Sequence, residues 1–192
     1  MAFRFPRSLV PLPDEGLPGY LLRLAYRLDL APARILQLTG LAGGDARFPC
    51  RTSHELMIRL DPAAREAFCQ ATRLDTAKAG SLCLDSLAPR YPVSAPTAHS
   101  RSLILRADWW IFSTASRYCP DCLAGDTPAA KAHGGAWRRS WRLPAVFACT
   151  RHQRLLEHLC PQCQRPAFET TGGNGRIPLI PALKASGLHP AQ

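Results

Sequence analysis

The sequence contains no uninterrupted hydrophobic run that approaches the roughly 20 residues needed to span a membrane. Its start, MAFRFPRSLVPLP, is broken by three prolines and lacks the apolar core of a secretory signal. These absences argue against the membrane and secreted classes of protein. We therefore expect a soluble protein in a reducing compartment, where thiols stay free to bind metal.

The motifs of two classes of zinc enzyme are also missing. No HExxH sequence of a metalloprotease occurs. A zinc deaminase needs HxE ahead of PCxxC, whereas here each proline lies inside its cysteine pair, and neither His133 nor His152 is followed by glutamate two residues later. These absences disfavour a metalloenzyme and favour a protein that acts by binding.

Acidic residues are scarce, because 14 Asp and Glu stand against 24 Lys and Arg, with a net charge of +10. Such a balance suggests an acidic partner, most simply nucleic acid. The 192 residues are enough for one domain or two small ones. Eighteen prolines and thirteen glycines predict short elements joined by many turns.

The strongest chemical signal is a group of cysteines between residues 119 and 163, which hold five of the chain's eight. Three pairs there, CPDC, CTRH and CPQC, are each separated by two residues. A turn of that length directs both side chains at one point, as half of a tetrahedral zinc shell requires. The six residues are Cys119, Cys122, Cys149, His152, Cys160 and Cys163.

These cysteines allow two other interpretations. A CxxC pair can be a redox dithiol, and cysteines in a short secreted chain can form disulfides. The redox interpretation is disfavoured because the chain has two CxxC pairs and a CxxH pair, with no βαβ pattern around them. The disulfide interpretation is disfavoured because no signal sequence precedes the cysteines. Six ligands are too many for one zinc ion and too few for two, so the pattern leaves a second site incomplete.

Leucines at helical spacing predict a first helix after residue 14, with Asp14 and Glu15 at its positive end. A second helix is expected from Pro32 to a stop at Gly40. Two helices joined by a turn over residues 29–31 fit a helix-turn-helix or an ordinary αα-hairpin, and periodicity alone favours the hairpin. The leucines that form the apolar stripe of the first helix are Leu17, Leu21, Leu24 and Leu28. Arg23 and Arg27 are expected on the exposed side of the same helix.

Further along, Ser53 is expected to cap a short helix through Leu60, and Asp61–Pro62 to begin another that ends near Leu74. A third short helix is expected over residues 80–88. The isolated cysteines are expected to pack in the core, since cysteine is among the most buried residue types. They are Cys50, Cys69 and Cys83.

The stretch WRRSWR at residues 137–142 interleaves arginine with tryptophan, which suits a surface that faces phosphate. Alternatively, Trp137 and Trp141 lie four residues apart and pack beside the metal. The candidate contacts to nucleic acid or a partner are Arg23, Arg27, Arg138, Arg139, Arg142, Arg151 and Arg154.

Two separated phrases resemble the TniQ family. PLPDEGLPGYLLRLAYRLDL is similar to its opening signature, and the match falls on Pro13, Asp14, Glu15, Leu22, Arg23, Leu24 and Ala25. RYCPDCLAGD, followed by WRRSWRLPAVFACTRHQRLLEHLCPQC, is similar to its zinc region. Tyr20 departs from the tryptophan common in the family. The two phrases occur in the family's order over residues 6–163.

This resemblance implies a non-catalytic targeting adaptor of DNA transposition in the bacterial cytoplasm. The implied partners are target DNA, or a CRISPR guide-RNA complex bound to it, and an AAA+ ATPase that recruits the transposase; a second copy of the chain is a further candidate. The alternative is a zinc-ribbon regulator that binds nucleic acid without a role in transposition.

The resemblance also implies an N-terminal helix-turn-helix and one Zn²⁺ ion held by Cys119, Cys122, Cys149 and His152. Relatives often complete a second zinc site after the CPxC. Here Cys160 and Cys163 have only His158 or His133 to add, so the second site is expected to be degenerate.

We therefore expect a mainly α protein, with a helix-turn-helix-like domain followed by a small zinc-finger region that has short strands. The helical part is assigned to residues 1–88, a connecting segment to 89–115, the zinc region to 116–165 and a flexible tail to 166–192.

Overall fold

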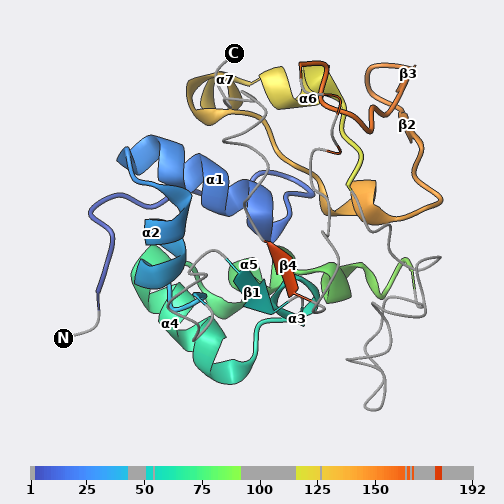
Figure 1. The fold of residues 1–192 in the computed structure, drawn as a ribbon. Coiled ribbons are helices and arrows are strands. Elements are labelled where there is room, and N and C mark those ends of the chain that lie inside the picture. Colours follow the sequence, from blue (N-terminus) through green and yellow to red (C-terminus); the bar gives the residue numbers. More distant parts are fainter. Residues whose placement is uncertain are drawn as a thin grey trace.

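The computed structural model describes residues 3–42, 51–53, 55–91, 116–125, 127–162, 164, 166 and 176–178. The expectation of a mainly helical protein with short strands is confirmed (Figure 1). The helices are α1 (Leu17–Leu28), α2 (Pro32–Leu38), α3 (Glu55–Ile58), α4 (Pro62–Thr72), α5 (Thr76–Ser81), α6 (Pro120–Ala124) and α7 (Pro128–His133), with 3₁₀ helices η1 (Leu84–Leu87) and η3 (Arg139–Arg142).

In the part of the chain that the structure describes, the strands form two antiparallel pairs. Strand β1 (Arg51–Ser53) pairs with β4 (Arg176–Pro178), and β2 (Ala148–Cys149) pairs with β3 (Arg154–Leu155). The first pair joins segments far apart in the sequence, so residues 176–178 lie beside the helical part of the protein (Figure 1).

Local sequence explains most helix boundaries. Helix α1 ends where Asp29 adopts a left-handed conformation and its N–H donates to the carbonyls of Ala25 and Tyr26. The predicted cap of α4 is confirmed, because the Asp61 carboxylate accepts from Ala64 N at 2.9 Å, a contact that contributes about 1 kcal/mol.

Two predicted helices differ in their boundaries. The helix expected from Ser53 to Leu60 is confined to α3, because Ser53 belongs to β1 and pairs with Arg176. The helix expected over residues 80–88 is instead the end of α5 followed by η1, with Cys83 extended between them.

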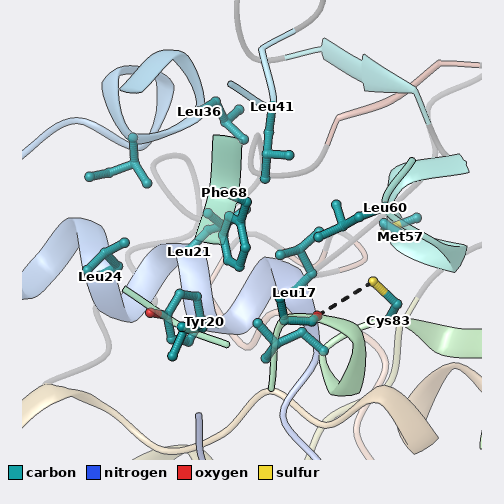
Figure 2. Packing of buried hydrophobic residues seen from close by; sticks show 14 of the residues in the cluster. Leu17, Tyr20, Leu21, Leu24, Leu36, Leu41, Met57, Leu60, Phe68 and Cys83 are labelled. Atoms are coloured by element: carbon teal, nitrogen blue, oxygen red, sulfur yellow. Dashed lines mark hydrogen bonds between the residues drawn. The ribbon is translucent and has the colours of Figure 1, made fainter. Parts of the chain in front are cut away.

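The main core lies between α1, α2 and α4 (Figure 2). The rings of Tyr20 and Phe68 meet edge to face with centroids 5.8 Å apart, and the Tyr20 hydroxyl donates to the Leu9 carbonyl at 3.1 Å. Cys83 packs in this core as expected, Cys69 is half-buried, and Cys50 lies outside the described residues.

The expectation that Arg23 lies on the exposed side of α1 is wrong. Its side chain is 3% exposed, and its Nη1 donates to both carboxylate oxygens of Glu15, at 2.9 and 2.7 Å. Glu15 is therefore paired with Arg23 and does not offset the positive potential at the N-terminal end of α1. The first turn of α1 contains no acidic residue. Burial raises the pKa of Glu15, while the charge of Arg23 opposes that rise.

The reason for this burial is that residues 137–139 cover a second face of α1. Gly16 N donates to the Trp137 carbonyl at 2.8 Å, and Arg139 N donates to the Asp14 carbonyl at 2.9 Å. At Gly19, an added Cβ would lie 2.7 Å from Trp137 Cβ, so only glycine allows this approach. The helical core and the cysteine-rich region thus pack directly against each other. No helix among the described residues has the length and apolar character of a membrane span.

Candidate metal centre

The first ligand pair lies at the start of α6. Cys119 is the residue before the helix and Pro120 is its first residue, which suits proline because that position needs no N–H donor. Leu123 N donates to the Cys119 carbonyl at 3.1 Å, closing the turn. The one-turn spacing brings the thiols of Cys119 and Cys122 to the same side.

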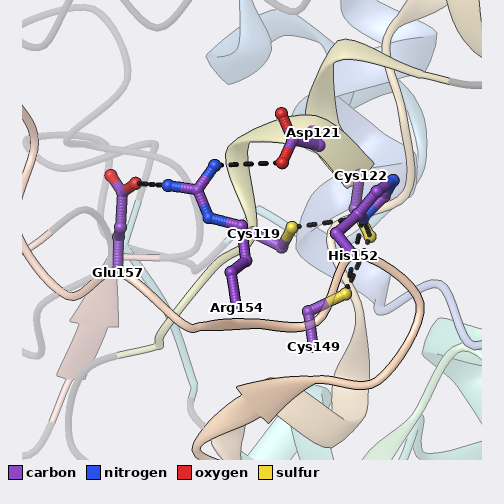
Figure 3. A network of polar contacts seen from close by, with 7 residues as sticks. All are labelled: Cys119, Asp121, Cys122, Cys149, His152, Arg154 and Glu157. Atoms are coloured by element: carbon purple, nitrogen blue, oxygen red, sulfur yellow. Dashed lines mark hydrogen bonds and ion pairs between the residues drawn. The ribbon is translucent and has the colours of Figure 1, made fainter.

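The second pair lies in the hairpin between β2 and β3. Cys149 ends β2, and His152 lies in the turn that leads to β3. Gln153 has a φ of 48°, the left-handed conformation that lets the chain reverse within so few residues. The tight turn directs the Cys149 thiol and the His152 ring toward α6 (Figure 3).

The four side chains converge. The Nδ1 atom of His152 lies 3.4, 3.3 and 3.5 Å from the sulfurs of Cys119, Cys122 and Cys149, and the sulfurs of Cys122 and Cys149 are 3.6 Å apart. Tetrahedral zinc with bonds of about 2.3 Å to sulfur and 2.0 Å to nitrogen places its ligand atoms about 3.5–3.8 Å apart. These four separations therefore match a Cys₃His zinc shell, and all four ligand atoms lie within 4.8 Å of one another.

The ionisation of the thiols also fits a cation site. Burial would raise the pKa of Cys149, but hydrogen bonds from His152 and from Arg151 N–H stabilise the thiolate and lower its pKa to about 6. Burial, followed by the contact with Cys149, raises the pKa of Cys122 to about 12. Several thiolates in one buried site repel each other, which costs electrostatic free energy. A bound cation attracts the thiolates and offsets that cost.

An ion-pair network braces the cluster from outside (Figure 3). Arg154 donates to Asp121, inside the first knuckle, at 2.9 Å, and to Glu157 at 2.7 Å. The network ties α6 to β3, the second strand of the hairpin. Arg154, predicted to contact nucleic acid, thus pairs with Asp121, and the opposite charge of Asp121 is the sequence signal for this pair.

The tryptophans pack against the cluster, as the alternative interpretation predicted. Trp137 and Trp141 are 7% and 2% exposed and meet edge to face at 6.1 Å. Trp137 Nε1 donates to the Ser116 hydroxyl at 2.8 Å, a partner that sequence analysis missed. Together with Tyr118 and Leu156, these rings and the cysteines form a small second core.

Gly135 is required by the first knuckle. It donates its N–H to the Leu123 carbonyl at 2.9 Å, and an added Cβ would lie 1.8 Å from the Cys122 carbonyl oxygen. No side chain can occupy that space, so this backbone contact helps to fix the position of Cys122.

The second predicted site is not assembled among the described residues. Cys160 is buried and His158 is exposed, whereas Cys163 lies outside the described residues. His133 instead has its Nε2 3.0 Å from Arg27 Nη1. Within the described part of the chain, the one group of potential metal ligands is Cys119, Cys122, Cys149 and His152.

The seven candidate arginines do not form one surface. Arg142 is buried like Arg23, and burial lowers its pKa to about 10. The guanidinium of Arg139 pairs with Asp14 at 3.4 Å and also contacts Ser81 and Ser86. Arg151 and Arg154 are exposed, while Arg27 and Arg138 are half-buried.

No curated protein matches the chain at a significant level. The sequence model of the TniQ family matches residues 6–156, from the proline-rich lead through the Cys₃His cluster, and ends before Cys160. Because the match spans most of the chain and includes all four converging residues, the protein belongs to the TniQ family of transposition-associated proteins.

Proposed function

We propose that this protein is a non-catalytic adaptor of DNA transposition that connects a target DNA, or a guide-RNA complex bound to it, to an AAA+ ATPase. The single observation that carries the proposal is the TniQ match over residues 6–156. Within this proposal, the helical part over residues 1–88 and the zinc region over 116–165 are the two working units.

Zinc is the metal that best suits the donor set of three thiols and one imidazole. With four protein ligands the shell has no open position for a substrate or a reactive water, which supports a structural rather than a catalytic ion. The second core contains few side chains, so bound zinc would supply a large share of the free energy that folds it.

Contact with DNA is supported by the net charge of +10. If α1 and α2 act as a helix-turn-helix, the second helix presents Arg34 and Gln37, whose side chains are exposed. Arg151, exposed beside the metal centre, supplies a further positive charge. The buried Arg23 and Arg142 are not part of the proposed DNA contact.

Contact with a protein partner is supported by apolar side chains in and around the β2–β3 hairpin. Phe147, Leu155 and Leu159 are 63%, 69% and 41% exposed. Large apolar side chains that stay exposed are candidates for contact with a protein partner. We assign this hairpin surface to the ATPase.

The test is capture of a purified AAA+ ATPase of a transposition system by the zinc-loaded protein. We expect Phe147→Ser with Leu155→Ser to abolish capture while zinc content stays unchanged. Capture of RNA or RNA polymerase, with no capture of the ATPase by the wild-type protein, would replace the proposal with the zinc-ribbon regulator.

A further inference from the structure

The lead into α1, residues 3–12, has no helix or strand of its own and is anchored to the helical core at two points. The side chains of Phe5 and Leu9 are 1% and 5% exposed. Phe5 N donates to the Ala71 carbonyl, at the end of α4, at 2.9 Å, and the Leu9 carbonyl accepts from the Tyr20 hydroxyl at 3.1 Å. The side chains beside these two anchors are therefore presented to solvent from a backbone that the core holds in place.

Phe3 is the aromatic side chain on the outer side of this lead. Its ring meets the buried Phe5 ring edge to face, with centroids 5.0 Å apart and planes at 87°. It is nevertheless 46% exposed. The contact with Phe5 orients the Phe3 ring while much of the ring stays in contact with water. An oriented and accessible aromatic ring is what an unpaired nucleobase stacks on.

Three exposed arginines accompany this ring. Arg4 and Arg7 belong to the lead, and Arg73 ends α4, two residues after the carbonyl that accepts from Phe5 N. Among the residues that the structure describes, no carboxylate forms an ion pair with any of the three. The acid nearest to Arg73 in the sequence, Asp75, instead pairs with Lys78 at 3.0 Å. The lead surface, defined as Phe3, Arg4, Arg7 and Arg73, thus combines an exposed ring with uncompensated positive charge.

We propose that the lead surface binds single-stranded nucleic acid, with one base stacked on Phe3 and the adjoining phosphates bound by the three arginines. Arg4 and Arg7 are three residues apart, so their backbones are separated by at most about 11 Å, and both guanidiniums reach one short stretch of strand. In a duplex the faces of the bases are covered by neighbouring base pairs, and an acidic peptide would use the arginines and leave the Phe3 ring in water. The inference goes beyond the adaptor role, in which DNA contact is assigned to α2 and Arg151.

The test measures binding of the full, zinc-loaded protein to a labelled oligothymidine strand by fluorescence anisotropy. A strand of about 12 nucleotides lies in the range of sites that combine stacking with a basic surface. The comparison probes are oligouridine, an abasic strand with the same number of phosphates, a duplex of the same length and oligoglutamate. We expect saturable binding of oligothymidine and of oligouridine, since neither stacking nor phosphate contact distinguishes their sugars. The abasic strand should bind about tenfold more weakly, because it has no base to stack.

Substitutions of Phe3 assign the stacking to this ring. Phe3→Leu keeps an apolar side chain against Phe5 but removes the ring, so we expect about tenfold weaker binding of oligothymidine and unchanged binding of the abasic strand. Phe3→Trp should bind oligothymidine at least as tightly as the wild type. Val10→Ala is the matched control, because Val10 lies on the same lead and is 71% exposed, and it should change nothing.

Substitutions of the arginines assign the phosphate contacts. Arg4→Gln, Arg7→Gln and Arg73→Gln should each reduce the slope of log affinity against log salt by about 0.7, the value expected for one phosphate of a single strand. Arg59→Gln is the control, since Arg59 is 50% exposed and lies directly after α3, and it should leave the slope unchanged. Urea denaturation of every variant shows that a loss of binding is not a loss of folding.

The proposal would be overturned if neither single strand bound saturably, or if the duplex or oligoglutamate bound more tightly than oligothymidine. Equal binding of the abasic strand, a comparison that needs no variant, would also overturn it, as would unchanged binding of oligothymidine by Phe3→Leu. Any of these results would leave the adaptor role standing, because that role is tested separately by capture of the ATPase.

Discussion

Arg23 and Glu15 form an ion pair closed to solvent, with side chains 3% and 0% exposed and a shortest distance of 2.7 Å. Glu15 Oε2 also accepts from Leu12 N at 2.9 Å, so the pair fixes the proline-rich lead against α1. Both residues belong to the phrase that resembles the TniQ signature. In this protein they hold the chain entering α1 in place and are closed to DNA.

Breaking this pair is expected to be costly. Glu15→Gln leaves Arg23 charged and buried without its counter-ion, and we expect a loss of about 3–5 kcal/mol in the free energy of unfolding. The double variant Glu15→Gln with Arg23→Met should recover part of that loss because no unpaired charge remains. Urea denaturation of the wild type, of Glu15→Gln, of Arg23→Met and of the double variant measures the coupling between the two residues. Additive losses in the free energy of unfolding would show that the ion pair does not act as a unit.

Metal content tests the candidate centre. We expect about one zinc ion per chain in reduced, purified protein, because four closing ligands bind one ion. Cys122→Ser should lose that zinc and the protease resistance of residues 116–162, since binding and folding of a small zinc region are coupled. Elemental analysis and limited proteolysis with and without a chelator are the measurements.

The matched control for metal content is Cys160→Ser. Cys160 lies outside the four-residue cluster, so its removal is expected to leave the zinc content unchanged. A fall in zinc with Cys160→Ser would show that the second knuckle binds metal, and wild-type folding without zinc would contradict a structural ion.

Gly135 offers a test that leaves every ligand in place. In Gly135→Ala the new Cβ would overlap the Cys122 carbonyl oxygen, and we expect a loss of about 1–3 kcal/mol in stability with faster removal of zinc by a chelator. Gly80→Ala is the control, because its Cβ meets nothing within 4 Å and alanine in a helix gains about 0.5–1 kcal/mol. Equal zinc release by the two variants would sink this interpretation.

The two-residue spacing within each ligand pair was predictable because each pair is local, whereas the choice of Cys119, Cys122, Cys149 and His152 as one shell followed from the resemblance to the TniQ family. Two intervening residues in CPDC and CTRH limit where the side chains can point, and the chain only had to bring two preformed pairs together. Helices α1 and α4 were predictable for a similar reason, since the leucine spacing and Asp61–Pro62 are short-range signals.

The burial of Arg23 was not predictable from periodicity. The spacing of the leucines indicates one buried face of the helix. A second face of α1 is buried by residues 137–139, which lie more than 100 positions away in the sequence. Gly16 and Gly19 mark that second face, because only a surface without side chains admits the backbone at Trp137. Glycines one turn apart were the overlooked signal.

Arg151 provides the sharpest test of DNA contact. It is exposed beside the metal centre. If Arg151 contacts a phosphate, Arg151→Gln should reduce the slope of log affinity against log salt by about 0.9 between 50 and 200 mM. Arg59→Gln is the control, since Arg59 is 50% exposed and lies directly after α3, in the helical part of the protein. Equal loss in both variants would mean that only overall charge matters, and an affinity of the wild-type protein that does not vary with salt would exclude direct phosphate contact.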